Sequence, residues 1–392
     1  LVRRTRQFII RHYAEYDDTR RRHYVMLKGE PAYFPVREPK RASFPIREDD
    51  PRDQYARLFS DEVVGVIESL VLPRYGLANF LVADAEHTAS AEEKRVLENL
   101  NRAGRRLIGF CRTNLFKRLE SGGYSFLLSV ERARMRKLVT LHALKNGLPI
   151  PIGTQDAAML DAALSDVDEE FVEADTNDSD SLHDTGETCD EATGEAGRGL
   201  AGITLVACQA HAEEIYERYS TRFRSRFNWL DPRLVRSDLA QALRTETEAL
   251  LSLLERAGAW DPARDTKLNG LLALLNGAHR EEKVLVFTQF ADTATYLSSQ
   301  LARRGIRDLA AVTNGTADPV GLVRRFSPST NGGLRNGETQ LRVLVATDVL
   351  AEGQNLQDAH IVVNYDLPWA IIRLIQRAGR VDRIGQQHDT IT

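Results

Sequence analysis

The sequence predicts an α/β fold in which a parallel sheet sandwiched by helices follows a mostly helical N-terminal region with a disordered acidic insert. Three observations lead to this expectation. Residues 263–392 alternate short apolar runs with helical stretches, a pattern typical of a βαβ parallel sheet. Residues 51–153 and 200–262 place apolar side chains at helical spacing. Residues 154–199 are acidic and rich in Ser, Thr and Gly.

The acidic residues are unevenly distributed. The formal net charge is −4, but residues 156–195 hold 15 Asp or Glu and no Lys or Arg. This stretch has too few apolar side chains to offset the entropy of ordering, so residues 154–199 are predicted to be disordered. The rest of the chain has 52 basic and 41 acidic residues, so the folded part is expected to be basic. A basic body suits a polyanionic partner, and charge alone does not distinguish DNA from RNA.

Composition argues against a membrane protein and against a disulfide framework. The chain has 392 residues, 42% of them hydrophobic, which allows two or three domains. No run of 18 or more apolar residues is present, so no membrane partner is expected. Cys111, Cys189 and Cys208 are scattered without a C-x-x-C pair. This usage fits reduced thiols in the cytoplasm and predicts no metal site.

The first 50 residues are basic and irregular. Residues 1–10 are compatible with a short helix or a strand. Prolines recur every few residues between 31 and 45, which predicts extended segments. Residues 1–50 are therefore expected to be an extended, basic linker. Because the chain opens inside this basic run and without Met, we expect it to be a fragment of a longer chain.

Two signals punctuate the helical stretch at 51–153. Ser90 and Glu93 form a capping-box pattern, and the glycine pair at 122–123 predicts a break that produces a helical hairpin. The dense basic run at 112–118 has two open interpretations. One is a functional role, either contact with a DNA backbone or coupling between lobes, and the other is a solvated amphipathic helix.

Residues 200–262 are predicted to be helical again. Aromatic and arginine side chains are interleaved between positions 216 and 229. Such a mixture can stack nucleobases. At helical spacing, packing within the fold is the favoured interpretation.

The region 263–392 contains four buried-type strands, around 284–287, 309–312, 343–346 and 360–364, with helices between them. In parallel sheets of this kind, ligands gather beyond the carboxyl ends of the strands. The polar residues at those ends are therefore candidate ligand contacts. They are Thr288, Gln289, Asn314, Gly315, Thr347, Asp348 and Asp366.

Arginine is concentrated at the end of the last helix. Arg377, Arg380 and Arg383 recur at a spacing of three, which predicts one helical face. A row of permanent cations suits a triphosphate or a nucleic-acid backbone. A solvated helix face is the alternative, and the neighbouring glycines, glutamines and buried-type strands argue against it.

Three stretches of this region resemble motifs of superfamily 2 helicases in the form used by Snf2-type DNA translocases. TDVLAEGQNL at 347–356 matches motif V, and QRAGRVDRIGQ at 376–386 matches motif VI. NYDLPW at 364–369, between them, is also a Snf2-type feature. The resemblance implies that 263–392 is the second, C-terminal RecA-like lobe, with a P-loop-type parallel sheet.

The same resemblance assigns the remaining regions. Residues 1–50 would be the linker from a first RecA-like lobe that is missing here, and 51–153 would be helical protrusions. Residues 154–199 would be the acidic insert, and 200–262 a further helical region.

The resemblance also implies roles for single residues. Arg380 and Arg383 would be arginine fingers that reach the phosphates of ATP, and Gln376 would help orient them. Gly353 and Asn355, in motif V, would couple the nucleotide to nucleic acid. The residues expected at the nucleic-acid backbone are Thr288, Gln289, Gly315 and Thr347.

Two parts of an ATPase are missing from the sequence. It contains no G-x-x-x-x-G-K-[ST] loop and no adjacent Asp-Glu pair after a buried strand. ATP and Mg²⁺ would therefore be bound mainly by the first lobe, in cis. This chain alone is predicted to be inactive as an ATPase.

The function that follows from the resemblance is the C-terminal motor lobe of an ATP-dependent, Snf2-type duplex-DNA translocase or helicase. Two alternatives are a non-catalytic nucleic-acid-binding or assembly module and an RNA helicase lobe. FCRTNLFKRLES at 110–121 and other helical stretches resemble the Snf2-type helicase subunit of the DISARM phage-defence system. The RNA-polymerase-recycling type of bacterial Snf2 ATPase is a second candidate, so defence-system or polymerase partners are expected.

Three features depart from the family's pattern. Ala370 stands where the family usually has Asn, and NGT at 314–316 stands where Asp-Gly-Ser is common. The sequence also ends at DTIT, where a next strand is expected to begin. These departures bear on how firmly the arginine fingers are held.

Overall fold

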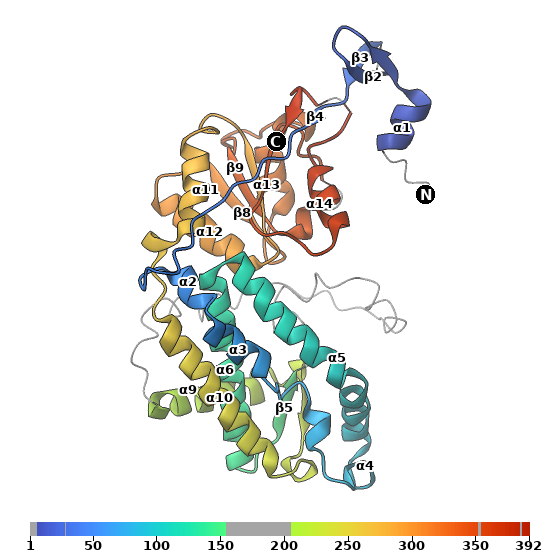
Figure 1. The fold of residues 1–392 in the computed structure, drawn as a ribbon. Helices are drawn as coiled ribbons and strands as arrows, with labels where there is room; N and C mark the ends of the chain where they lie inside the picture. The colour runs from blue at the N-terminus through green and yellow to red at the C-terminus, as the bar shows by residue number, and fades with distance from the viewer. Residues whose placement is uncertain (1–5, 28, 154–204, 352–353, 385) are drawn as a thin grey trace. The chain divides into compact units, whose positions relative to one another are not determined.

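The structure is a computed structural model that describes residues 6–27, 29–153, 205–351, 354–384 and 386–392 (Figure 1). The expected disordered insert at 154–199 lies outside the described residues. The described chain forms two compact units. The α/β unit combines the residues up to Phe44 with Thr266–Thr392, and the helical unit runs from Pro45 to Asp265.

A four-stranded parallel sheet is the centre of the α/β unit, as the sequence predicts. Its strands are β7 (Val284–Phe287), β8 (Leu309–Val312), β9 (Val343–Ala346) and β10 (Ile361–Asn364). They lie in the order β10-β7-β9-β8, and all neighbouring pairs are parallel. Every side chain of β7 and β9 is fully buried, which explains why these two strands are continuous apolar runs.

Helices pack on both faces of this sheet, and Figure 1 shows α11 and α12 on one side and α13 on the other. The helices are α11 (Thr266–Asn276), α12 (Ala291–Arg303), α13 (Pro319–Phe326) and α14 (Ile371–Ala378), with short 3-10 turns η6 (Pro328–Thr330) and η7 (Asp348–Ala351). On the α13 side, one apolar cluster joins the sheet to α13 and to the segments before and after α14. Its members include Phe287, Leu344, Val323, Phe326, Leu350, Leu356 and Val381.

The N-terminal segment contains more regular structure than the expected extended linker. Helix α1 (Arg6–Tyr13) precedes an antiparallel sheet of β1 (Glu15–Asp17), β2 (Arg22–Leu27) and β3 (Glu30–Tyr33). The sheet is held by cross-strand aromatic and hydroxyl contacts, such as Tyr33 Oη donating to Asp17 Oδ2 at 2.6 Å. Strand β4 (Val36–Arg37) then pairs in parallel with β11 (Thr390–Ile391) at the other end of the sequence.

In the part of the helical unit that the structure describes, four long helices form most of the fold. They are α5 (Ala91–Ser121), α6 (Gly123–Lys145), α9 (Leu205–Ser220) and α10 (Asp238–Ala257), with shorter α2 (Gln54–Leu58), α3 (Asp61–Ser69), α4 (Ala85–Thr88), η1 (Leu77–Phe80), η3 (Arg224–Arg226), η4 (Pro232–Leu234) and η5 (Pro262–Arg264). The predicted capping box and helical hairpin are both present. At Gly123 a Cβ would lie 2.2 Å from the Trp260 ring, so close packing explains this glycine.

Two expectations for the helical unit need correction. Residues 227–230 form a strand, β6 (Phe227–Leu230), which pairs antiparallel with β5 (Ile150–Gly153) instead of continuing a helix. The basic run at 112–118 is also used internally. Arg112 donates to Leu70 O at 2.8 Å, and Arg118 is 1% exposed, so these two arginines fit neither a DNA-contact face nor a solvated face.

The aromatic side chains interleaved with arginine pack within the helical unit, as the favoured interpretation holds. Tyr216 and Phe227 are buried, and the rings of Tyr219 and Phe227 lie 4.4 Å apart. No helix of the described chain combines the length and the apolar character that crossing a membrane requires.

Candidate functional site

The carboxyl ends of β7 and β10 bring Thr288, Gln289 and Asp366 together. The Thr288 hydroxyl donates to one oxygen of the Asp366 carboxylate, and the Gln289 N–H donates to the other at 2.8 Å. The Gln289 side-chain amide donates to Leu367 O at 2.9 Å. All three residues are buried. The predicted nucleic-acid residues Thr288 and Gln289 therefore lie at the expected edge, with their polar atoms engaged inside the domain.

Thr347 and Gly315 follow the neighbouring strands β9 and β8. The Thr347 N–H donates to Val312 O at 3.0 Å. Its hydroxyl oxygen is buried and has no hydrogen-bond partner among the described residues. Gly315 is exposed in the turn after β8. A buried hydroxyl without a partner is costly, so Thr347 is the predicted contact whose side chain is best suited to bind a ligand.

Asp348 and Arg377 form a buried ion pair between η7 and α14. Arg377 Nε lies 2.5 Å from Asp348 Oδ1, and Nη2 lies 3.0 Å from Oδ2. The remaining guanidinium nitrogen donates to Asn364 Oδ1 and Asp366 O, both at 3.2 Å. The Arg377 side chain is completely buried, and its guanidinium lies 5.3 Å from the centre of the Phe287 ring. This arginine therefore joins α14 to the carboxyl edge of the sheet.

The expectation that Arg377, Arg380 and Arg383 share one helical face is wrong. Helix α14 ends at Ala378, and Gly379 caps it by donating its N–H to Ile375 O at 2.9 Å. Glycine disfavours continuation of a helix. Arg380 and Arg383 lie in the following turn, and we call its described residues, 379–384 and 386, the arginine turn.

Arg380 and Arg383 both point to the same backbone oxygen. Arg383 Nη2 donates to Gln354 O at 2.9 Å, and Arg380 Nη1 lies 3.5 Å from that oxygen. Arg383 also directs Nε to Gly379 O at 3.4 Å. Two guanidinium groups are thus held side by side by a neutral carbonyl of the segment that precedes β10.

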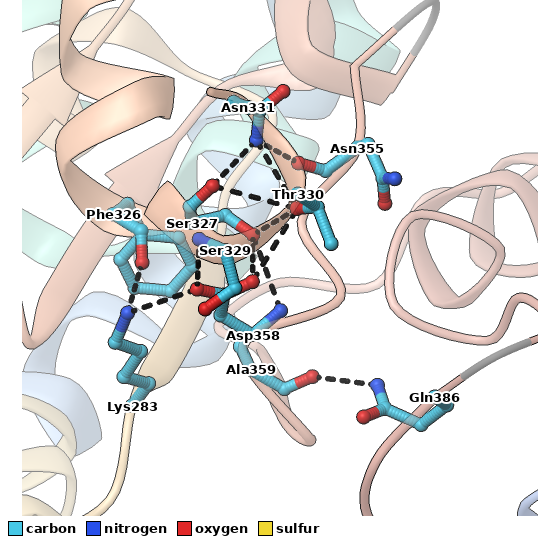
Figure 2. Close-up of polar contacts among 10 residues, drawn as sticks. All are labelled: Lys283, Phe326, Ser327, Ser329, Thr330, Asn331, Asn355, Asp358, Ala359 and Gln386. Carbon is cyan, nitrogen blue, oxygen red and sulfur yellow. Dashed lines mark hydrogen bonds and ion pairs between the residues drawn. The ribbon is translucent and has the colours of Figure 1, made fainter. Parts of the chain in front are cut away.

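That segment, residues 354–360, leads into β10 from the side of β9, and we call it the β9–β10 crossover. Leu356 N donates to Arg380 O at 3.2 Å, and Gln357 Nε2 donates to Ile384 O at 3.2 Å. Gln386 Nε2 donates to Ala359 O at 3.0 Å, as Figure 2 shows, and to Val381 O at 2.9 Å. The crossover and the arginine turn are therefore bonded along most of their length.

The other predicted residues of this region are placed as follows. Asn355 lies on the crossover, and its side-chain oxygen is buried without a partner among the described residues. Gln376 is half-buried on α14, one residue before Arg377. Gly353 lies outside the described residues.

Helix α14 buries its cationic side and exposes its apolar side. Arg377 faces the protein, while large apolar side chains around the start of the helix are exposed to solvent. Their exposed fractions are Leu367 64%, Trp369 63%, Ile371 73%, Ile372 56% and Ile375 52%. Large apolar side chains that gather in an exposed segment are typical of an interaction site. Periodicity separates the apolar side of a helix from its polar side but does not show which of the two faces inward. The exposed apolar side of α14 was therefore not predicted from the sequence.

The arrangement can stabilise negative charge but provides little else. Two arginines beside one carbonyl can bind an anionic ligand such as a phosphate. Among the described residues, no group of three His, Cys, Asp or Glu is placed to hold a metal ion.

Comparison with known proteins finds a family match in the region that contains this site. Residues 266–385 match the family described as Helicase conserved C-terminal domain. The chain is 37% identical over 109 residues to the uncharacterized ATP-dependent helicase YqhH of Bacillus subtilis (strain 168), which covers 28% of this chain and 18% of that protein. It is 38% identical over 126 residues to the RNA polymerase-associated protein RapA of Vibrio vulnificus (strain YJ016), covering 32% of this chain and 12% of that protein.

Among solved structures, the chain is similar to the C-terminal part of the Fun30 ATPase domain. The TM-score is 0.36 at 14% identity, covering 92% of this chain and 84% of that one. Residues 266–385 are thus similar to a helicase C-terminal domain, and one of the relatives is described as an ATP-dependent helicase. The chain spans less than a fifth of the length of the two curated relatives named above.

Proposed function

We propose that the α/β unit is the C-terminal motor lobe of an ATP-dependent, Snf2-type translocase that moves along duplex DNA. The observation that carries this proposal is the pair of guanidinium groups of Arg380 and Arg383, held together on Gln354 O at the end of α14. Two fixed cations in a turn outside the helix are suited to stabilise the charge that develops on a phosphate during hydrolysis.

The nucleotide itself would be held elsewhere. ATP and Mg²⁺ would bind mainly to a first RecA-like lobe in the same polypeptide, which supplies the P-loop and the acidic pair. Arg380 and Arg383 would complete that site from this lobe, with Gln376 orienting them. Gly353, and Asn355 on the crossover, would link the nucleotide site to the carboxyl edge of the sheet.

The exposed apolar side of α14 supports the presence of a covering domain. Ile371, Ile372 and Ile375 lie on the helix that leads directly into the arginine turn. A domain that covers this surface would also meet the arginines, as a first lobe in cis must. An apolar surface of this kind would be left in water if the lobe acted alone.

Nucleic acid would contact the other polar residues of the carboxyl edge. Thr347 has a hydroxyl without a partner among the described residues, and Gly315 exposes its backbone. Thr288 and Gln289 would also contact the phosphates, either in addition to their hydrogen bonds to Asp366 and Leu367 or in place of them. Hydroxyl and backbone contacts to phosphates do not read sequence, which suits a protein that steps along any DNA.

The test is the ATPase activity of the complete gene product, measured without nucleic acid, with duplex DNA and with RNA. Stimulation by duplex DNA is expected, with no activity from the 392-residue chain alone. Stimulation by RNA instead would favour an RNA helicase lobe. A complete protein that binds DNA but hydrolyses no ATP would show a non-catalytic module and overturn the proposal.

A further inference from the structure

We propose that Asp358 and Asn331 are positioning residues for the arginine pair: they fasten the β9–β10 crossover to the turn after α13 and so fix the carbonyl on which Arg380 and Arg383 meet. This inference rests on the proposed function. Asn331 donates to Asn355 O (Figure 2), whereas the two arginines contact the preceding carbonyl, Gln354 O.

Asp358 is bonded on both carboxylate oxygens to the turn at residues 327–331, which we call the Ser327 turn. Its Oδ1 accepts from Ser327 Oγ at 2.9 Å and from Thr330 Oγ1 at 3.3 Å. Its Oδ2 accepts from the Ser329 N–H at 2.9 Å. The Asp358 N–H in turn donates to Ser327 Oγ at 3.1 Å. Side chain and backbone of one residue therefore hold the crossover to this turn, as Figure 2 shows.

A lysine at the amino-terminal edge of the sheet also contacts both Asp358 and the residue before the Ser327 turn. Lys283, just before β7, donates to Phe326 O at 2.5 Å and lies 3.6 Å from Asp358 Oδ2. Burial opposes the charge on Asp358, but hydrogen bonds from Ser329 and Ser327 outweigh it and keep the pKa of that carboxyl below its usual range. Asp358 is thus charged at neutral pH and able to make strong hydrogen bonds.

Asn331 extends the attachment to the residue next to Gln354. Its Nδ2 donates to Ser327 O at 2.7 Å and to Asn355 O at 2.8 Å. Both amide hydrogens are therefore used, one on the Ser327 turn and one on the crossover. Because Asn355 follows Gln354 directly, the position of Gln354 O depends on this bond.

The crossover therefore lies between two sets of bonds. The Ser327 turn holds it at Asn355 and Asp358, and the arginine turn is bonded to it at Gln354, Leu356, Gln357 and Ala359. Loosening the first set would move the carbonyl that orients both guanidinium groups. A shift of about 1 Å in a positioning group can reduce a rate by about 100-fold.

Asn331→Asp in the complete protein is the most direct test. The side chain keeps its shape but loses both donors, and a carboxylate oxygen then faces the carbonyls of Ser327 and Asn355. We expect kcat for DNA-stimulated ATP hydrolysis to fall by about 10–100-fold. KM for ATP and affinity for duplex DNA should stay within about twofold, because ATP binding and most DNA contacts lie elsewhere.

Two further variants separate positioning from loss of the fold. Asp358→Ala should reduce kcat like Asn331→Asp, and Asp358→Asn should recover part of it because the amide oxygen can still accept from Ser329 N–H. Glu338→Gln is the matched control. Glu338 pairs with Arg324 and accepts from the Arg335 N–H in the same unit, and it makes no contact with the crossover in the described structure.

Hydrogen exchange on the 392-residue chain gives a readout that needs no ATPase. In Asn331→Asp, peptides covering 354–359 and 380–384 should exchange faster, while those covering β7 should not change. Faster exchange confined to 327–331, or kcat within about twofold of wild type while Arg383→Ala is inactive, would overturn the inference. A wild-type complete protein without ATPase would instead reject the proposed function, and this inference with it.

Discussion

The helix α14 and the arginine turn that follows it use the same residue type in two different ways. Arg377, on the helix, is completely buried and pairs through two nitrogens with Asp348. Arg383, in the turn, is partly exposed and contacts only backbone carbonyl oxygens within the described structure. A carboxylate neutralises the first arginine, whereas the second is oriented without being neutralised. The partner, rather than the spacing, distinguishes Arg383 from Arg377 as a group that can serve an external anion.

Replacing an arginine of the turn should give the largest effect on activity. Arg380→Ala and Arg383→Ala in the complete protein are each expected to lower ATP turnover by about 10³–10⁵-fold, the range found for arginine fingers. ATP binding should change little, because the nucleotide is expected to be held by the first lobe. For Arg383→Ala the free energy of unfolding should also change little, because the Arg383 guanidinium contacts backbone carbonyl oxygens within the described structure. Steady-state ATPase, nucleotide-binding and denaturant-unfolding measurements check these three quantities.

Arg303→Ala is a matched control for these variants, since Arg303 is exposed at the end of α12 in the same unit. It should leave turnover unchanged. Near-normal turnover in Arg380→Ala and Arg383→Ala would refute their assignment as fingers.

Replacing the helix arginine should give the opposite outcome, a loss of stability. Arg377→Ala leaves the Asp348 carboxylate buried at the carboxyl edge, where Arg373, at 3.4 Å, is the cationic contact that remains within the described part of the chain. Breaking a buried pair in this way costs about 3–5 kcal/mol in the free energy of unfolding. Urea unfolding of the 392-residue chain measures it. The double variant Arg377→Met with Asp348→Asn should recover part of the loss, because it removes the buried charge.

If Arg377→Ala unfolds at the same urea concentration as wild type, the distinction between a structural and an available arginine fails. If it is stable but inactive, Arg377 belongs with the arginines of the turn.

The sheet and its polar edge could be predicted from the sequence because their signals are local. Continuous apolar runs such as 284–287 indicate buried strands, and polar residues directly after them must share one edge of a parallel sheet. Thr288, Gln289 and Thr347 lie at that edge for this reason.

The end of α14 could not be predicted in this way, because its cause lies far along the chain. The Asp382 carboxylate in the arginine turn is paired with Arg6 at 2.7 Å and with Arg37, both from the N-terminal segment. Leu356 N–H holds the Arg380 carbonyl. These tertiary contacts, with Gly379, end a helix that residue spacing alone would extend to Arg383.

The Ser327 turn was missed for a similar reason. Ser327, Ser329 and Asn331 resemble ordinary turn residues when considered locally. Asp358, the partner of Ser327 and Ser329, is 31 residues away from Ser327 and precedes another strand. Asn355, the partner of Asn331, lies on the same segment. Only the return of the crossover to the start of β10 brings them together.

A substitution on the apolar side of α14 tests whether another domain covers this helix. Its expected effect on activity is smaller. Ile372→Ser should leave the free energy of unfolding of this chain almost unchanged, because the side chain is 56% exposed. In the complete protein it should lower kcat/KM for ATP by roughly 5–30-fold, the effect of truncating an interface residue worth about 1–2 kcal/mol. Val320→Ser, at a residue 60% exposed on α13, is the matched control and should have no effect. Equal activity of the two variants would show that α14 remains in water.

The smallest expected effect is on stability and concerns His360, a titratable residue at the opposite, amino-terminal edge of the sheet. His360 stacks on His388 with ring centres 3.8 Å apart, and its Nε2 lies 3.3 Å from Glu282, which also contacts His279. Burial, followed by the nearby His388, holds the pKa of His360 below its usual range. Protonation is therefore easier in the unfolded chain than in the folded one. The stability linked to His360 is fully present above its unfolded pKa of about 6.5 and is lost as pH falls through the folded value.

Urea unfolding at pH 7.5, 6.5 and 5.5 should show this loss as a gradual decrease in the free energy of unfolding. His360→Gln should flatten the decrease across that interval, since glutamine does not titrate. The arginine pair keeps its charge throughout, so ATP turnover corrected for the folded fraction should not follow the same curve. An identical pH slope in wild type and His360→Gln would assign the decrease to other groups. A turnover that follows the His360 titration would mean that the two edges of the sheet are coupled, and the arginine turn would then depend on the base of β10 as well as on the crossover.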